Sequence, residues 1–334
     1  MVLAPAVRVP KREAQATRER LQELGVLRHD LEVAREGDDV LFPVAPACGP
    51  TLPTVDWDFV PRERRPSDYR ELLQGWSAEE LDAAPRAFDQ VGDIVVVKVP
   101  DSLEARAQEL GEAIRQFHAN CRAVFHDRGV EGVFRVRGLQ RIAGSGGSAT
   151  VVGENGFRFH VDPAAAYFSP RLGGERARVA ALVRPGEHVV DLFGGVGALA
   201  VQAAARGATV DTVDLNPIAC ELARRNVELN RTRGVGVHCG DARQVARDLA
   251  KADRIVMNLP HGAFAFLDVA AALAAPSAVL HHHEILPSAD VASREAQVLA
   301  RLRELGRQAE VLQRRVVRRY SAQDDHVVWD LRLP

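Results

Sequence analysis

The second half of the chain alternates between strand-like and helix-like segments, and this alternation restricts the possible folds more than any other feature. Apolar, β-branched runs predict strands at residues 188–193, 209–214, 235–239, 254–258, 278–283, 309–317 and 326–333. Helical patterns between the first six runs indicate a mainly parallel, doubly wound sheet with helices on both faces, an α/β fold. A short polar loop joins the last two strands, so we expect an antiparallel C-terminal hairpin.

Two smaller α+β regions precede this unit. Residues 1–50 combine a charged helical pattern with a short strand and end in a proline cluster that predicts a linker. Residues 65–150 contain the β-branched run DIVVVKV at 93–99, which predicts a buried strand. Ser102 follows as the expected N-cap of a helix. We therefore expect a small module at 1–50, a middle domain at 65–150 and an α/β domain at 151–334.

The composition limits the class of protein. A formal net charge of −2 excludes a uniformly basic nucleic-acid-coating protein, although it allows a local basic groove. The four cysteines are dispersed, which argues against a disulfide framework or a zinc site. Apolar runs stay shorter than the roughly 18 residues that a membrane span needs. We expect a cytoplasmic monomer that does not bind membranes.

A run of potential metal ligands, His281-His282-His283-Glu284, lies on a predicted strand. Neighbouring side chains on a strand point to opposite faces of the sheet, so these four cannot easily converge on one ion. We therefore expect no metal site in this protein.

The segment VVDLFGGVGALA at 189–200 has the pattern of a ligand-binding strand, turn and helix. A strand ends near Asp191, and the helix begins near Ala198. Glycines allow a ligand to approach the backbone closely, and a helix N-terminus presents free N–H groups. The glycine spacing at Gly194, Gly195 and Gly197 is G-G-x-G, which differs from the G-x-G-x-x-G of dinucleotide-binding folds.

Acidic residues follow the next two strands. Asp214 ends the second strand, where a carboxylate can accept hydrogen bonds from two ribose hydroxyls. Asp241 follows the third strand, where its carboxylate can accept a hydrogen bond from an adenine amino group. Helix capping is the alternative for Asp214, for the nearby Asn216 and for Asp241. These features together resemble class I methyltransferases that use S-adenosylmethionine (AdoMet), and the resemblance implies an AdoMet site between the glycine turn and both aspartates.

Two further segments carry candidate chemistry. Asn258-Leu259-Pro260 ends the fourth strand and resembles the N-P-P-Y-type motif of methyltransferases that act on planar nitrogen, with a helix N-cap as the alternative role for Asn258. The segment 162–178, DPAAAYFSPRLGGERAR, lies just before the cofactor domain. Its composition alone favours a surface ion pair between Arg171 and Glu175, which would lie one helical turn apart.

A more specific resemblance comes from several motifs in order: FRVRGLQ, ENGFRF, VDPAAAYFSPRLGGERARVA, DLFGGVG, DLNP and DRIVMNLP. Together they resemble the archaeal and eukaryotic type of tRNA (guanine-37-N1)-methyltransferase. The resemblance runs from about residue 131 to 268 and continues more loosely to the C-terminus. The N-terminal module also resembles the first domain of the archaeal members, whereas residues 45–65 have no convincing counterpart.

The resemblance implies roles for individual residues. Glu175 would be the general base that removes the proton from guanine N1, and Arg135 would donate to guanine O6. A phosphate contact is the alternative for Arg135. Tyr167 and Asn258 would orient the base and the cofactor. The implied AdoMet-binding residues are Asp191, Phe193, Gly194, Gly195, Gly197, Asp214, Leu215, Asp241 and Asn258.

The expected partner is tRNA, whose anticodon-loop guanine must leave its stack to enter such a pocket. In the resembling family the small N-terminal module contacts the tRNA outer corner. Two other functions stay open: transfer of the aminocarboxypropyl group of AdoMet during wybutosine synthesis, and non-catalytic tRNA binding by a methyltransferase fold. Candidate phosphate contacts are Lys11, Arg12, Arg62, Arg64, Arg65, Arg314, Arg315, Arg318 and Arg319.

Overall fold

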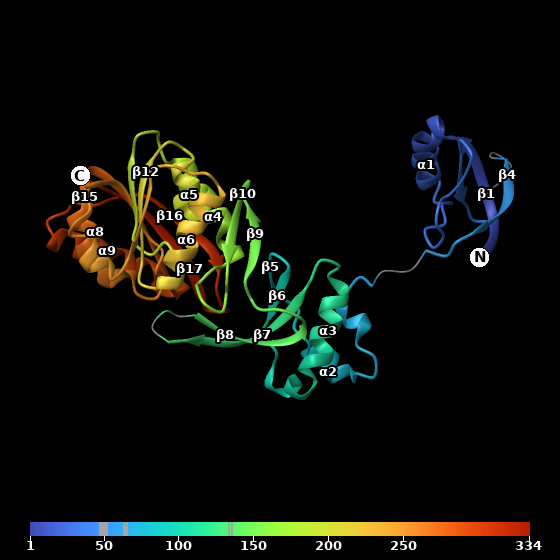
Figure 1. The fold of residues 1–334 in the computed structure, drawn as a ribbon, viewed down its shortest axis with the longest axis horizontal. Coiled ribbons are helices and arrows are strands. Elements are labelled where there is room, and N and C mark those ends of the chain that lie inside the picture. Colours follow the sequence, from blue (N-terminus) through green and yellow to red (C-terminus); the bar gives the residue numbers. More distant parts are fainter. Residues whose placement is uncertain (47–52, 63–65, 133, 135) are drawn as a thin grey trace. The chain divides into compact units, whose positions relative to one another are not determined.

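The computed structural model describes residues 1–46, 53–62, 66–132, 134 and 136–334. The chain divides into two compact units, Met1–Glu71 and Leu72–Pro334. Figure 1 colours the first unit blue and the second from cyan to red. None of the helices in the described part of the chain is long and apolar enough to cross a membrane.

The described residues of the first unit form a four-stranded sheet and one α-helix. The strand order is β2-β3-β1-β4, and β1 pairs antiparallel with both β3 and β4. β3 confirms the expected strand near residue 40, but β1 and β4 were not predicted, and β4 lies beyond residue 50, where a linker was expected. The elements are β1 Val2–Pro10, η1 Lys11–Glu13, α1 Ala14–Glu23, β2 Ala34–Glu36, β3 Asp39–Pro43 and β4 Thr54–Phe59.

The second unit begins with a small α+β region whose sheet has the order β5-β6-β7-β8. The buried run Ile94–Val97 forms β6, as the sequence predicts. Ser102 is not an N-cap, because it lies inside a 3-10 helix whose cap position is Pro100. The elements are η2 Tyr69–Leu72, α2 Ala78–Ala83, β5 Asp89–Val91, β6 Ile94–Val97, η3 Asp101–Arg106, α3 Ala107–Phe117, β7 Ala123–Glu131 and β8 Val136–Gly144.

A hairpin connects this region to the large sheet. β9 (Thr150–Glu154) and β10 (Phe157–Val161) pair antiparallel, and β10 packs on helix α6 (Pro217–Leu229). The fully buried Asn226 of α6 makes this contact specific: it accepts from His160 N at 2.6 Å and donates to His160 O at 3.0 Å. Its amide also donates to Val196 O at 2.9 Å, so one side chain ties the hairpin, α6 and the glycine turn together.

The large sheet has seven strands in the order β13-β12-β11-β14-β15-β17-β16. β11 to β15 pair in parallel, whereas β17 pairs antiparallel with β15 and β16. This arrangement confirms the expected parallel sheet with a C-terminal antiparallel hairpin. The strands are β11 His188–Asp191, β12 Thr209–Asp214, β13 Val235–Cys239, β14 Ala252–Met257, β15 Ala274–Pro287, β16 Glu310–Arg319 and β17 Asp324–Leu333.

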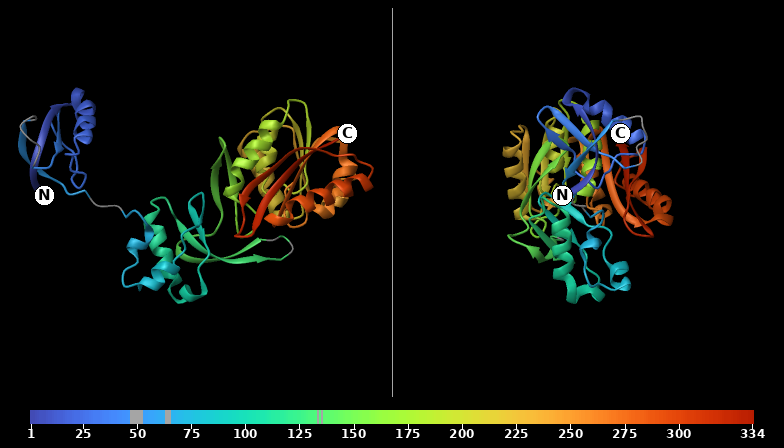
Figure 2. Two further views of the ribbon diagram at one scale, coloured as in Figure 1. Left: turned by 180° about the vertical axis from the view of Figure 1, so that it is seen from behind. Right: turned by 90° about the vertical axis from the view of Figure 1, so that its right-hand side faces the viewer.

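Helices cover both faces of this sheet (Figures 1 and 2). On one face, α4 packs on α5 and on β14 through Val179, Ala180, Leu199 and Val256. On the other face, residues of α8 and α9 join β14, β15 and β17 in the largest apolar cluster. The remaining elements are η4 Pro170–Leu172, α4 Gly173–Leu182, α5 Ala198–Ala204, α7 Ala242–Val245, η5 Ala263–Phe266, α8 Leu267–Leu273, η6 Ser288–Asp290 and α9 Val291–Glu304.

Candidate active site

The glycine turn leads from β11 to α5, as the sequence predicts. Gly195 and Gly197 have φ values of +56° and +75°, which side chains with a Cβ rarely adopt. A Cβ on Gly194 would lie 1.8 Å from Thr212 Oγ1 of the neighbouring strand, so only glycine fits there. The turn therefore lies at the carboxyl edge of the sheet with no side chains of its own at its three glycines, so a bound nucleoside can approach its backbone closely.

Asp214 ends β12 beside this turn. Its Oδ2 accepts from Gly195 N at 2.8 Å, and its Oδ1 accepts from Asn216 N at 2.8 Å. Each carboxylate oxygen can accept a second hydrogen bond, so Asp214 can still take ribose hydroxyls. Burial raises the pKa of Asp214 even though both hydrogen bonds oppose the shift.

Asp191, at the end of β11, is almost completely buried. Burial raises its pKa to about 7, and the nearby Asp214 carboxylate contributes to the rise. A hydrogen bond of 3.4 Å from Phe193 N opposes the shift but does not outweigh the effect of burial. A buried carboxylate of this kind is suited to a cationic ligand, because an adjacent positive charge would favour its ionised form. AdoMet carries two such groups, an ammonium and a sulfonium.

Helix capping is the alternative role for three residues, and two of them, Asn216 and Asp241, are helix caps. Asn216 is the N-cap of α6, since it accepts from Ile218 N at 3.0 Å, and Asp241 caps α7 by accepting from Arg243 N at 2.8 Å. The cap role of Asp241 leaves one carboxylate oxygen for a ligand. Leu215 is about half exposed, and Phe193 packs edge-on against Phe266 with ring centroids 5.0 Å apart.

Asn258 directly follows β14, and its Oδ1 is buried without a hydrogen-bond partner among the described residues. The cap position of the next helical turn, η5, is Gly262, so Asn258 is not its N-cap. An unpaired buried acceptor costs roughly 1–3 kcal/mol, which a ligand donor could offset. This orphaned oxygen fits a role in holding a bound group.

Glu175, in the first turn of α4, is buried and surrounded by basic groups. Arg178 donates to both of its oxygens, at 2.9 and 2.7 Å, and Arg315 of β16 donates to Oε2 at 3.3 Å. His283 Nε2 lies 3.8 Å from Oε1. The expected surface pair between Arg171 and Glu175 is wrong, because the Arg171 Nε atom instead donates to Asp89 at 2.6 Å.

The strand register brings Glu175 and Asn258 to the same edge. Val256 pairs with His281 and Met257 with His282, and Asn258 and His283 are the next residues along the two strands. Val256 packs against α4, and side chains alternate along a strand, so Asn258 faces the side of the sheet that α4 and α5 cover. Glu175, Asn258 and the glycine turn therefore share one face and one edge of the sheet.

Tyr167 lines a cavity of about 290 Å³ next to Ser169, in the segment that leads into α4. Its walls also include Arg318 and Tyr320 from the C-terminal hairpin and Lys98 from the middle region. Basic and aromatic side chains are well suited to an extruded base and its phosphates. Arg135, expected to contact guanine O6, lies outside the described residues.

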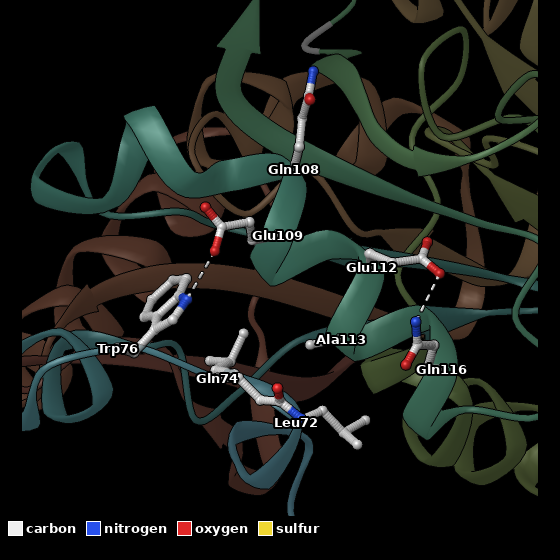
Figure 3. Close-up of a pocket in the computed structure, with 9 residues that line it drawn as sticks. Leu72, Gln74, Trp76, Gln108, Glu109, Glu112, Ala113 and Gln116 are labelled. Atoms are coloured by element: carbon white, nitrogen blue, oxygen red, sulfur yellow. Dashed lines mark hydrogen bonds between the residues drawn. The ribbon is translucent and has the colours of Figure 1, made fainter.

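A larger hollow of about 490 Å³ lies in the middle region between Leu72 and α3 (Figure 3). Four of its polar side chains pair with one another: Trp76 Nε1 donates to Glu109 at 3.2 Å and Gln116 donates to Glu112 at 3.1 Å. It shares no residue with the cavity at Tyr167. Its size therefore gives no reason to place the chemistry there.

Several residues that shape the site were missed at the sequence level. Thr212 fixes the need for glycine at 194, Asn226 anchors the turn, and Arg178 pairs with Glu175. Asp330 of β17 in turn holds Arg178. Only Arg178 had a local signal, since it lies three residues after Glu175 on a predicted helix.

Family models match most of the chain. The TRM5/TYW2 methyltransferase domain matches residues 150–312, the TYW2 N-terminal domain matches 69–147, and the tRNA methyltransferase 5 N-terminal domain matches 6–50. These three matches cover both the glycine turn and the segment that carries Glu175.

Individual relatives extend over nearly the full length. The tRNA (guanine(37)-N(1))-methyltransferase Trm5b of Pyrococcus abyssi is 37% identical over 98% of both chains, and that of Methanocaldococcus jannaschii is 31% identical over 98% of both. An aminocarboxypropyltransferase that acts on 4-demethylwyosine in tRNA(Phe), from Pyrococcus horikoshii, is 28% identical over 79% of this chain and 95% of its own.

Solved structures agree with these relationships. The crystal structure of Trm5b from Pyrococcus abyssi has a TM-score of 0.80 at 36% identity and covers 100% of this chain and 99% of its own. A complex of aTrm5 with tRNALeu has a TM-score of 0.77 at 30% identity and covers 99% of this chain and 100% of its own. The chain therefore belongs to the tRNA (guanine-37-N1)-methyltransferase family, the family that its motifs resemble.

Proposed function

We propose that this protein transfers the methyl group of AdoMet to N1 of guanosine 37 in tRNA, with Glu175 as the general base. The observation that carries the proposal is a buried carboxylate, Glu175, 3.8 Å from His283 of β15, together with the orphaned amide oxygen of Asn258 at the end of the neighbouring strand β14. The relatives that cover the whole chain are named for this reaction.

The residues present fit AdoMet. Gly194 lets the turn pack against Thr212, Asp214 offers free lone pairs to ribose hydroxyls, and Asp191 supplies a buried carboxylate to a cation. Bound AdoMet supplies a methyl group on sulfonium sulfur, which leaves as the neutral thioether of S-adenosylhomocysteine.

In the proposed reaction, Asn258 holds the guanine so that its N1 faces the methyl carbon in line with the sulfur. Glu175 takes the N1 proton on one of its oxygens as the new N1–C bond forms. The net charge balances, because the sulfonium loses its positive charge while Glu175 loses its negative charge. Arg135 would donate to O6, where negative charge develops.

We further propose that the middle domain, residues 65–150, and the cavity at Tyr167 receive the anticodon loop. Lys98, Arg137 and Arg318 line that cavity and could neutralise phosphates. The first unit would contact another part of the tRNA. A structural neighbour that was solved in complex with tRNALeu supports tRNA as the partner.

The test uses the purified protein, AdoMet labelled in the methyl group, and tRNA transcripts with guanosine or adenosine at position 37. Labelled N1-methylguanosine, formed only with guanosine 37, supports the proposal. AdoMet labelled in its aminocarboxypropyl group, offered together with tRNA(Phe) that carries 4-demethylwyosine at position 37, is the parallel assay, and incorporation of that label would establish the alternative reaction. If neither label is transferred although the tRNA binds, a non-catalytic role follows.

A further inference from the structure

A continuous chain of hydrogen-bonded ionisable side chains runs behind Glu175. Arg178 bridges two carboxylates: besides Glu175, its Nη1 donates to Asp330 Oδ2 at 2.6 Å and its Nη2 donates to Oδ1 at 3.1 Å. Asp330 is buried on β17 and is also 2.6 Å from Nδ1 of His281 on β15. Nε2 of His281 in turn lies 2.8 Å from Nη1 of the buried Arg254.

The positions of the protons along this chain follow from the partners. A guanidinium can only donate, so Arg254 donates to Nε2 of His281, and that nitrogen carries no hydrogen. The hydrogen of the neutral ring is therefore on Nδ1, which donates to Asp330. Burial lowers the pKa of His281, in agreement with a neutral ring.

Asp330 is consequently a stable anion. Burial by itself would raise its pKa, but hydrogen bonds from His281 and Arg178 outweigh this effect and hold the pKa below its ordinary value. Burial acts to lower the pKa of Arg178, but its bonds to Glu175 and Asp330 prevail and raise it. The Arg178 guanidinium is therefore permanently charged and shared between two carboxylates.

This sharing matters when Glu175 changes charge. The groups that face Glu175 are Arg178 on its own helix, His283 on β15 and Arg315 on β16, with Asp330 on β17 behind Arg178. Once Glu175 is protonated, Arg178 loses one anionic partner but keeps the other. Without Asp330, Glu175 would be the one carboxylate bound to Arg178. The positive charge of Arg178 would then oppose the protonation of Glu175 more strongly.

We propose that Asp330, acting through Arg178, is a positioning residue that keeps Glu175 a competent base by sharing the charge of its arginine partner. The role rests on the proposed function, because it concerns the step in which Glu175 receives the guanine N1 proton. His281 and Arg254 fix Asp330 from the other side, so the geometry of Arg178 is retained in both charge states of Glu175.

The test is Asp330→Asn, measured by single-turnover methyl transfer to tRNA with guanosine 37 at pH values from about 5 to 9. With the Asp330 charge gone, Arg178 stabilises the ionised form of Glu175 more strongly. The acidic limb of the pH–rate profile should therefore move to lower pH by about one unit, and the plateau should fall by up to about tenfold as the base weakens. Asp330→Glu, which keeps the charge, should restore the wild-type limb.

Glu154→Gln is the matched control. Glu154 forms a buried ion pair with Arg176 of α4, and this pair is separate from the ion pair of Arg178 with Glu175. Loss of the Glu154–Arg176 ion pair should lower the thermal unfolding temperature without moving the pH–rate profile. If Asp330→Asn fails to fold, Asp330→Ser makes the same charge change with a smaller side chain. A readout independent of activity is the ¹⁵N spectrum of His281, which should show a neutral ring protonated on Nδ1.

The outcomes separate the two proposals. An inactive wild-type protein contradicts the proposed function itself. The role of Asp330 is overturned if the wild-type protein is active and the Asp330→Asn and Asp330→Ser variants keep the acidic limb and the plateau of its pH–rate profile. An equal loss of rate at every pH in Asp330→Asn and Glu154→Gln would also overturn it, since it would indicate a purely structural effect.

Discussion

The backbone N–H of Gly195 donates to Oδ2 of Asp214 across 2.8 Å, and this bond joins the glycine turn to the end of the neighbouring strand. The turn and the carboxylate are therefore positioned as one unit, and a change in one displaces the other. Thr212, two residues before Asp214, reinforces the arrangement by filling the space next to Gly194.

Replacing Gly194 with alanine should disrupt this unit. The new Cβ would lie 1.8 Å from Thr212 Oγ1, so the turn must shift away from β12. We expect AdoMet affinity to fall by at least about tenfold, equivalent to about 1.4 kcal/mol. Isothermal titration calorimetry measures the affinity. Gly153→Ala is the control, since a Cβ there meets nothing within 4 Å, and the double variant Gly194→Ala/Thr212→Ala should recover part of the loss.

Glu175→Gln should slow methyl transfer by about 10²–10⁴-fold, the usual contribution of a general base. The amide retains the shape of the side chain but cannot accept the N1 proton effectively. AdoMet affinity should stay near the wild-type value, because Glu175 lies outside the glycine turn. Single-turnover assays and calorimetry test the two statements separately, and a fully active variant would exclude Glu175 as the base.

Asn258→Ala should lower the activity without lowering the stability of the fold. The buried Oδ1 of Asn258 has no partner among the described residues, so its removal relieves an unsatisfied acceptor. We expect the free energy of unfolding to stay constant or to rise by about 1 kcal/mol, while methyl transfer falls at least about tenfold. Chemical denaturation and single-turnover assays provide the two numbers. A large loss of stability would show that Asn258 mainly supports the fold.

Asp191 predicts a pH-dependent stability that AdoMet should alter. Its pKa is raised to about 7, so the folded state binds an additional proton between about pH 4 and pH 7. The sign follows: this group stabilises the fold at low pH, and the contribution is lost as the pH rises through 7. Asp191→Asn should therefore raise the stability of the free protein at pH 8 by about 2–4 kcal/mol, and leave it unchanged near pH 4.

The same substitution should weaken AdoMet binding, because it removes the buried anion. Thermal unfolding of both proteins at pH 4 and pH 8, with and without AdoMet, checks all of these expectations. A variant that is less stable than the wild type at pH 8 would contradict the assigned protonation.

Removal of the first unit should weaken tRNA binding but leave AdoMet binding intact. The position of the cut matters, because β4 pairs with β1 and its Phe59 is fully buried in the first unit. A deletion that ends at residue 50 would leave β4 unpaired, whereas a chain that starts at Leu72 removes the whole compact unit. Filter binding with tRNA and calorimetry with AdoMet measure both effects, and unchanged tRNA affinity would refute the role.

The parallel sheet and its glycine turn could be predicted because their signals are local. Strand-length apolar runs, the helix start at Ala198 and the short loop before β17 each follow from neighbouring residues. The strands β1 and β4 were missed because their pairing depends on residues about 50 positions apart, with prolines and charges that suggest irregular structure.

The candidate site was only partly predictable for the same reason. Asp191, Glu175 and Asn258 lie in recognisable motifs, but their partners do not. Asp330 is 152 residues from Arg178 along the chain, and no periodicity connects them. The surface pair of Arg171 with Glu175 was a reasonable local expectation, yet a tertiary contact with Asp89 replaces it.

β17 follows every other described element in the sequence, yet it occupies an inner position of the sheet between β15 and β16. During synthesis, β15 and β16 therefore emerge before the strand that lies between them. β15 can pair with β17 only after β17 has been made. Because Asp330 arrives on this strand, the nascent chain gains both its closed sheet and the anion behind Arg178 in the same late event.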